Sequence, residues 1–163
     1  MTKPVVIGVG NEYRRDDGIG PALIAILEDS WLPEVQLIVS DGDPARLIDD
    51  WAGAPLAVVV DAVLCEPSTP GEIHRTELPQ HQFISDRGDP AAEPQSHAAG
   101  SHSLGIPDAL RLGAALDRLP HRLVVYAVEA ADVSFGTELS DPVAAALQQL
   151  ADAVRTELGL PSR

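Results

Sequence analysis

Acidic side chains follow the first three apolar runs of this 163-residue chain. Asp16 and Asp17 lie in the loop after the first run, Asp41 follows the second run, and Asp61 ends the third. Carboxylates that converge with one imidazole make a three-ligand site with open positions, and this donor set suits nickel, zinc, manganese or iron. His102, in a loop before a predicted helix, would complete such a site. Because these residues are far apart in the sequence, the fold must bring them together.

Other chemistries have weaker support. The loop that begins Gly8-Val9-Gly10 has Tyr13 where a dinucleotide-binding loop needs a third glycine, and no Gly-Lys-Ser or Gly-Lys-Thr occurs. Carboxylates near the start of the next helix would repel a phosphate, although Arg14 and Arg15 keep nucleotide binding open. Cys65 has no adjacent histidine or asparagine, which favours a small buried residue over a nucleophile, and the Gly-x-Ser-x-Gly turn of serine hydrolases is absent.

Each candidate also has a structural interpretation. Asp16 and Asp17 precede a helical stripe, where acidic residues commonly cap the first turn. Asp61 closes the run Leu-Ala-Val-Val-Val, where a carboxylate is costly to bury without a charged, metal or hydrogen-bonding partner. The sequence alone leaves open whether Asp16 or Asp17 faces the crevice.

Strands that alternate with helices would position these side chains. Apolar β-branched runs predict buried strands, stripes at helical spacing predict helices, and half-exposed alternation over Gly71–Leu78 predicts an antiparallel edge strand. The expected fold class is α/β, a three-layer sandwich with a mostly parallel, twisted sheet of about five strands and helices on both faces. Sites in such sheets form beyond the carboxyl ends of the strands. The predicted strands are Val5–Val9, Val35–Ser40, Leu56–Ala62 and Leu123–Val128. The first and last of these are predicted to be buried, and the third is apolar on both faces up to Asp61.

The remaining segments are consistent with a single domain over residues 1–163. The last predicted helix can be capped by Ser140 or Asp141, and Gly159 ends it. Residues 79–100 are polar, rich in Pro, Ala and His, and without periodicity, so we expect a mobile loop there. Because this loop precedes the histidine loop, a substrate lid is one hypothesis for its role.

The charge balance argues against several partners. The chain has 11 Lys and Arg against 25 Asp and Glu, a formal net charge of −14, whereas nucleic acids and anionic membranes need a basic face. The single cysteine, Cys65, permits no intrachain disulfide and suits a reducing cytosol. The apolar run Pro4–Val9 is too short for a membrane span and lacks a signal-peptide cleavage site. We therefore expect a cytoplasmic protein, and its acidic surface favours a monomer.

Three segments, Gly8–Gly20, Val60–Val63 and Ser101–Gly105, carry motifs in a fixed order. Together they resemble the motifs of the hydrogenase maturation proteases, peptidase family M52. Gly8–Gly20 resembles the family's opening motif, in which Gly-x-Gly-Asn is followed after four variable residues by Asp-Asp-Gly or Asp-Glu, a hydrophobic residue and Gly. Val60–Val63 resembles the Asp-Ala segment of the third strand, and Ser101–Gly105 resembles the histidine loop. The motifs occur in the family's order, and the opening motif is the most specific of the three.

The resemblance implies an aspartic-type endopeptidase that removes a C-terminal extension from the nickel-loaded precursor of the large subunit of nickel–iron hydrogenase. On the matching positions, Asp17, Asp61 and His102 would be the catalytic, nickel-binding residues. The nickel would be supplied by the substrate itself. Asp41, beside the flexible Gly42, is the candidate for positioning the substrate or a water molecule.

One position departs from the family's pattern. Family members commonly have two glycines after the acid of the second strand, and here Asp43 replaces the second glycine. A side chain there would narrow the cleft or change which precursor is accepted, so the departure bears most on the role of Asp41. Gly42 and Asn11 are the expected substrate-binding residues.

Three other functions stay open. The same two carboxylates and histidine would serve a nickel-dependent chaperone that docks on a metallated partner without cutting it. They would also serve an endopeptidase of the same fold that acts on another small-protein precursor. A nucleotide-binding regulator would instead bind ATP or NAD. The partner's mass before and after incubation separates cleavage from docking.

Overall fold

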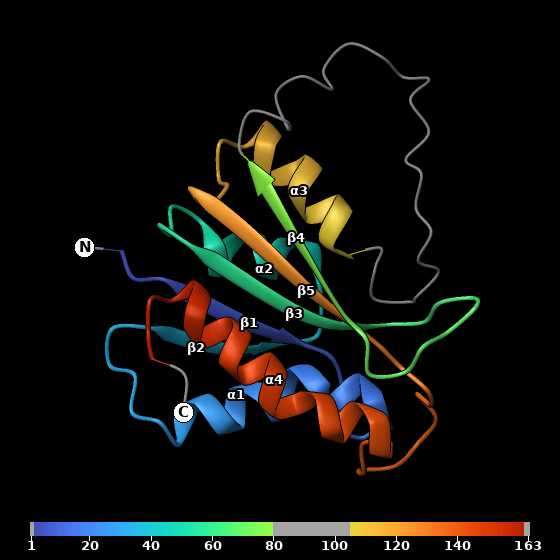
Figure 1. Cartoon of the computed structure of the whole chain (residues 1–163). Coiled ribbons are helices and arrows are strands. Elements are labelled where there is room, and N and C mark those ends of the chain that lie inside the picture. Colours follow the sequence, from blue (N-terminus) through green and yellow to red (C-terminus); the bar gives the residue numbers. More distant parts are fainter. Residues whose placement is uncertain (1, 80–104, 162–163) are drawn as a thin grey trace.

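The computed structural model describes residues 2–79 and 105–161. Strands and helices alternate along most of the chain (Figure 1). The elements are β1 (Val5–Val9), the short 3-10 helix η1 (Arg15–Gly18), α1 (Ile19–Glu28), β2 (Gln36–Ser40), α2 (Pro44–Trp51), β3 (Ala57–Val63), β4 (Ile73–Pro79), α3 (Gly105–Ala115), β5 (Arg122–Glu129) and α4 (Asp141–Glu157).

The five strands form one sheet in the order β2-β1-β3-β5-β4. The strands β2, β1, β3 and β5 are parallel, whereas β4 pairs antiparallel with β5 at the edge. This arrangement confirms the predicted α/β fold and the antiparallel edge strand. The chain places β2 on one side of β1 and β3 on the other, so the strand order reverses between β1 and β3. Ligand sites of open α/β sheets form at such a switch point.

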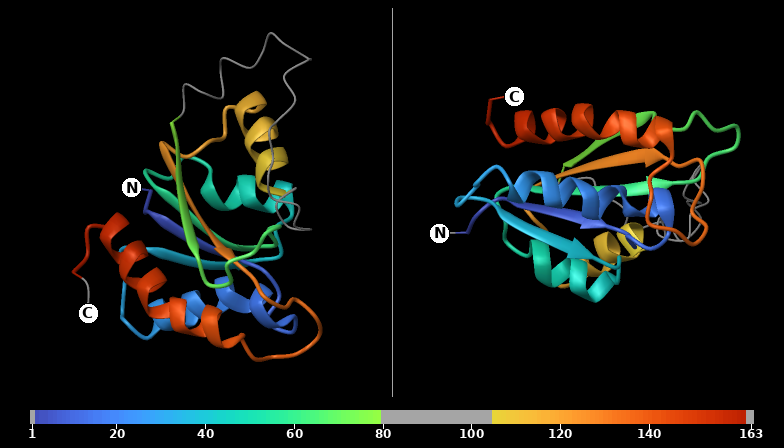
Figure 2. Two further views of the ribbon diagram at one scale, coloured as in Figure 1. Left: turned by 45° about the vertical axis from the view of Figure 1, so that its right-hand side comes forward. Right: turned by 90° about the horizontal axis from the view of Figure 1, so that it is seen from below.

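Helices cover both faces of the sheet (Figure 2). α1 packs against α4 over one face, and α2 packs against α3 over the other. The α1/α4 layer buries Leu23 and Val58, and the α2/α3 layer buries Trp51 and Val59. Successive strand residues point to opposite faces, so a strand covered on both sides must be apolar at nearly every position. Asp61 breaks this rule in β3.

Glycines of the opening motif let α1 pack closely on β1. A Cβ atom on Gly8 would lie 2.3 Å from the carbonyl oxygen of Gly20, and one on Gly20 would lie 2.5 Å from the carbonyl oxygen of Val9. These separations are far below van der Waals contact, so a larger residue would push the helix off the sheet. Helix–strand packing therefore explains these glycines without a bound phosphate.

Both ends of α4 follow the predicted signals. Pro142 occupies the first turn, and Gly159 follows the last turn with a φ of 71°. Ser140 is the N-cap residue, but its side chain makes no capping hydrogen bond. Its hydroxyl instead donates to Asp16 at 2.8 Å. Ser140 therefore occupies the predicted N-cap position, while its hydroxyl binds a charged acceptor instead of a backbone N–H of α4.

Two further predictions concern segments rather than elements. No helix among residues 2–79 and 105–161 is long and apolar enough to cross a membrane. The loop predicted over residues 79–100 lies outside the described residues, apart from Pro79 at the end of β4. The lid hypothesis for that loop therefore stays a prediction.

Candidate active site

Asp61 lies near the carboxyl end of β3, beside the switch point of the sheet. Only 2% of the residue is exposed, and neither carboxylate oxygen accepts a hydrogen bond from the described residues. Burial and the nearby charge of Asp17 raise the pKa of Asp61 to about 8, and the adjacent Ala62 amide opposes them only in part. Asp61 is therefore mostly protonated at neutral pH, and a cation placed beside it would displace the proton.

Asp17 comes from η1, in the loop between β1 and α1. It is 2% exposed, and its Oδ2 accepts a hydrogen bond from the backbone N–H of Asn11 at 3.0 Å. Gly10 makes this loop possible, because its φ is 140° and a Cβ there would lie 1.9 Å from the carbonyl oxygen of Asp17. The loop thus fixes Asp17 close enough to Asp61 to raise the pKa of that residue.

Asp16 has a different environment from its neighbour. It is fully buried and accepts hydrogen bonds from the backbone N–H groups of Ala131 at 2.8 Å, Asp132 at 3.0 Å and Ser140 at 2.7 Å, and from the Ser140 hydroxyl. This carboxylate ties η1 to the loop between β5 and α4. The capping interpretation is wrong for both acids, because the N-cap of α1 is Gly18 and no side chain caps the helix.

The two arginines of the opening motif contact the same loop. Arg14 Nε donates to the carbonyl oxygen of Val133 at 3.1 Å, and its guanidinium lies 5.7 Å from the centre of the Phe135 ring. Arg15 pairs with Asp132 at 3.6 Å. Both side chains therefore have roles in holding the loop after β5. Because these contacts account for Arg14 and Arg15, neither arginine is evidence for a nucleotide-binding site.

The loop after β2 places Asp41 on the surface. Its side chain is 66% exposed, and its Oδ1 accepts a hydrogen bond from the backbone N–H of Asp43 at 3.1 Å. Asp43, the position that departs from the family's pattern, is the N-cap of α2 and accepts from the backbone N–H of Arg46 at 3.0 Å. Helix capping therefore accounts for the aspartate at this position.

Gly42 connects this loop to α3. Its φ is 85°, and a Cβ on Gly105 would lie 2.2 Å from the Gly42 carbonyl oxygen. The loop after β2 and the first residue of α3 are therefore in close contact. His102 precedes α3 in the sequence and lies outside the described residues, so its place in the candidate site stays a prediction.

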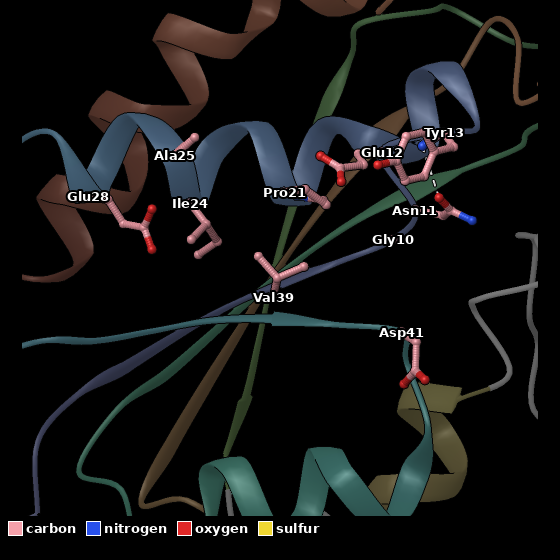
Figure 3. Close-up of a pocket in the computed structure, with 10 residues that line it drawn as sticks. All are labelled: Gly10, Asn11, Glu12, Tyr13, Pro21, Ile24, Ala25, Glu28, Val39 and Asp41. Carbon is pink, nitrogen blue, oxygen red and sulfur yellow. Dashed lines mark hydrogen bonds between the residues drawn. The ribbon is translucent and has the colours of Figure 1, made fainter. Parts of the chain in front are cut away.

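A groove runs between α1 and the edge strand β2 (Figure 3). Ile24 and Ala25 of α1 lie across it from Val39, whose side chain is about half exposed. Asn11 and Asp41 line one end. Two of the residues expected to bind or position the substrate thus border one groove, and Asn11 also contacts Asp17.

Glu129 carries no sequence-based prediction, and Cys65 is less buried than its sequence pattern predicts. Glu129 ends β5, is 4% exposed, and lies 2.9 Å from His74 through Oε2 and Nε2. The available signal was an acid that ends an apolar strand, the same pattern as Asp61. Cys65 is half-buried rather than buried, and burial together with Glu129 raises the pKa of its thiol. A raised pKa argues against a nucleophilic thiolate.

Comparisons with known proteins give the family of the chain. The sequence model described as HycI, hydrogenase maturation protease, matches residues 23–157. Among solved structures, the chain resembles the hydrogenase maturating endopeptidase HybD from E. coli with a TM-score of 0.76 and 20% identity, covering 97% of this chain and 93% of that chain. No curated protein matches the chain.

Two archaeal structures are also similar. The [NiFe] hydrogenase maturation protease HybD from Thermococcus kodakarensis has a TM-score of 0.72 and 25% identity, over 96% of this chain and 99% of that chain. The hydrogenase 2 maturation peptidase from Thaumarchaeota archaeon SCGC_AB-539-E09 has a TM-score of 0.74 and 24% identity, over 98% of this chain and 100% of that chain. The family match extends from α1 to the end of α4, and the structural likenesses extend the fold over nearly the whole chain. This chain therefore belongs to the hydrogenase maturation protease family and is a hydrolase of the endopeptidase class.

Proposed function

We propose that this protein removes the C-terminal extension from the nickel-loaded precursor of a nickel–iron hydrogenase large subunit. The observation that carries the proposal is the buried carboxylate of Asp61, which has no hydrogen-bond partner among the described residues and lies near the charge of Asp17. Burying a carboxylate in this way costs free energy. A cation bound by both acids would relieve the desolvation and the repulsion together.

The proposed nickel ligands are Asp17, Asp61 and His102. Two carboxylates and an imidazole suit a nickel ion that also keeps ligands from the substrate. Gly105, three residues after the histidine, is packed on the loop that follows β2, which supports a rim shared by the histidine loop and the carboxylates. Because the nickel belongs to the substrate, cleavage would require a loaded precursor.

Hydrolysis of the scissile peptide bond adds the hydroxyl of water to the acyl carbon and a proton to the leaving amine. Bound nickel would supply polarisation of the scissile carbonyl or a lowered pKa of a water molecule. Within this chain, Asp61 releases its proton to solvent when the cation binds, and the Asn11 amide holds Asp17 in place. Asp41, exposed at the end of the groove, orients the substrate or the water.

The groove beside β2 is the proposed binding place for an extended segment of the precursor. β2 is an edge strand, so its outer backbone groups offer main-chain hydrogen bonds to an added strand. Val39 and Ile24 provide apolar contacts, while Glu12, Glu28 and Asp41 favour basic side chains. Asn11 and Gly42 would contact the segment where it approaches the carboxylates.

Intact mass spectrometry of the precursor tests this function. The precursor is purified with and without nickel and mixed with the wild-type protein, with Asp61→Asn, or with Asp43→Ala as a matched acidic control. We expect a C-terminal fragment to be lost only from the nickel-loaded form, and only with the wild type and Asp43→Ala. A stable complex without a mass change would favour a non-cleaving checkpoint protein. Equal cleavage with and without nickel would contradict nickel recognition.

A further inference from the structure

A second group of metal-ligating side chains lies near the antiparallel edge of the sheet. Among residues 2–79 and 105–161, Glu72, His74 and Glu129 each offer one ligand atom, and these atoms lie within 4.8 Å of one another. We call these three residues the edge cluster. They come from the connection before β4, from β4 itself and from the last residue of β5.

The edge cluster is built around a buried carboxylate. Glu129 is 4% exposed, its Oε2 lies 2.9 Å from His74 Nε2, and its Oε1 accepts a hydrogen bond from the backbone N–H of Thr69 at 3.1 Å. These two contacts fix the orientation of the Glu129 carboxylate, as a metal-binding carboxylate requires.

The donor atoms of the edge cluster favour a divalent cation. The ligand oxygens of Glu72 and Glu129 lie within 4.8 Å of each other. Two carboxylates and an imidazole held this close together form a donor set that suits a divalent ion. The Cys65 thiol interacts with Glu129 as well, so a softer donor borders the same point. Oxygen and imidazole donors with a neighbouring sulfur suit zinc better than magnesium or calcium.

We propose that Glu72, His74 and Glu129 form a zinc-class metal site that is separate from the nickel-recognition residues. The exposed side chain of His74, which is 48% accessible, gives an ion a path from solvent. The buried Glu129 and the Thr69 amide supply the fixed inner wall. A bound ion would cross-link β4, β5 and the connection before β4.

The edge cluster lies on the same face of the sheet as Asp61. Asp61 pairs with Ala127 in the register of β3 and β5, and His74 pairs with the same Ala127 in the register of β4 and β5. Side chains at one register position point to the same face, and two strand spacings amount to roughly 10 Å. The metal site would therefore hold the edge of the sheet next to the candidate active site without sharing its ligands.

Metal titration of the full-length, metal-stripped protein tests this proposal independently of the proposed function. Zinc binding is measured by calorimetry with wild type, with Asp61→Asn, and with Asp61→Asn that also carries His74→Ala or Glu72→Gln, and magnesium serves as the control ion. His74→Ala changes an exposed side chain, and circular dichroism verifies its fold. In Asp61→Asn, whose nickel-recognition site is disabled, we expect a remaining zinc equivalent. Adding His74→Ala to that variant should weaken it about 100-fold or more, and adding Glu72→Gln should weaken it about 10-fold.

Two results would overturn the metal site. Zinc binding by Asp61→Asn that stays equally tight when His74→Ala is added would show that the imidazole forms only an ion pair with Glu129. Magnesium binding as tight as zinc binding would show a general acidic surface rather than a site selected by imidazole. A cobalt(II) spectrum provides a second measurement, because the ligand-field bands that persist in Asp61→Asn should disappear when His74→Ala is added to that variant.

Discussion

Asp16 and Asp61 are both buried carboxylates, but the regions around them differ. Asp16 accepts four hydrogen bonds from the loop after β5 and the start of α4. Asp61 accepts none from the described residues and lies near the negative charge of Asp17. A carboxylate whose lone pairs are satisfied stabilises the fold, whereas a buried one without donors lowers stability and marks a functional site. Asp16 therefore stabilises the loop after β5, whereas Asp61 is available to bind a ligand.

Replacing Asp61, the buried acid without hydrogen-bond donors, should have the largest effect on precursor processing. Asp61→Asn removes a ligand charge and should slow precursor processing at least ~1,000-fold, because a metal contact supplies several kcal/mol to the transition state. The fragment released from the nickel-loaded precursor is followed by mass spectrometry, with circular dichroism as the control for folding. Processing within a few-fold of wild type would remove Asp61 from the active site.

Replacing Asp16, the hydrogen-bonded acid, should lower stability and leave processing nearly unchanged. Asp16→Ala leaves several donors without an acceptor, so we expect a loss of about 3–4 kcal/mol in the free energy of unfolding. Urea denaturation measures this loss. At temperatures where the variant is folded, its processing rate should stay within a few-fold of the wild-type rate. A rate as low as that of Asp61→Asn in the folded variant would mean that Asp16 takes part in the reaction.

The pH dependence of stability sharpens the comparison. Asp61 titrates near 3.8 in the unfolded chain and near 8 in the folded protein, so between these values the folded state holds one more proton. Stability should therefore fall as pH rises, by about 1.4 kcal/mol per pH unit relative to Asp61→Asn, or about 3 kcal/mol from pH 5 to pH 7. Urea unfolding of both proteins across this range measures the difference. Parallel pH profiles would contradict the raised pKa.

Substitutions of Asp41 and Asp43, the acids after β2, should have the smallest effects, and each serves as a control for the other. Asp43→Ala removes the N-cap of α2 and should cost about 1 kcal/mol of stability, with processing unchanged. Asp41→Ala changes an exposed side chain and should leave stability within about 0.5 kcal/mol while it slows processing. Thermal unfolding and processing assays of both variants check this pattern. Normal processing by Asp41→Ala would remove its positioning role.

Much of the fold follows from local sequence patterns. Apolar β-branched runs predicted the buried strands, because a strand covered on both faces must be apolar. The alternation of Ile73, Arg75 and Glu77 with His74 and Thr76 predicted the edge strand, and β4 occupies that position. The cap by Asp43 had a local signal as well, since an acid before Pro44 commonly begins a helix.

The roles of the individual acids did not follow from local patterns. Asp16 and Asp17 are adjacent in the sequence. Asp16 has a structural role only because it accepts hydrogen bonds from a loop that lies more than 100 residues later in the chain. The contact between His74 and Glu129 likewise joins residues 55 positions apart. Such pairings depend on the register of the strands and the path of the loops. The sequence therefore predicted which kinds of side chain lie at the carboxyl ends of the strands, but not the role of each one.

Direct titration of the Asp61 carboxyl tests the central claim, that this acid is buried without donors until a cation binds. Carbon-13 NMR of labelled aspartate, with Asp61→Asn to assign the signal, gives its pKa before and after nickel is added. We predict a pKa of about 8 for the free protein and a fall of several pH units with nickel. A pKa near 4 that nickel does not change would contradict the account.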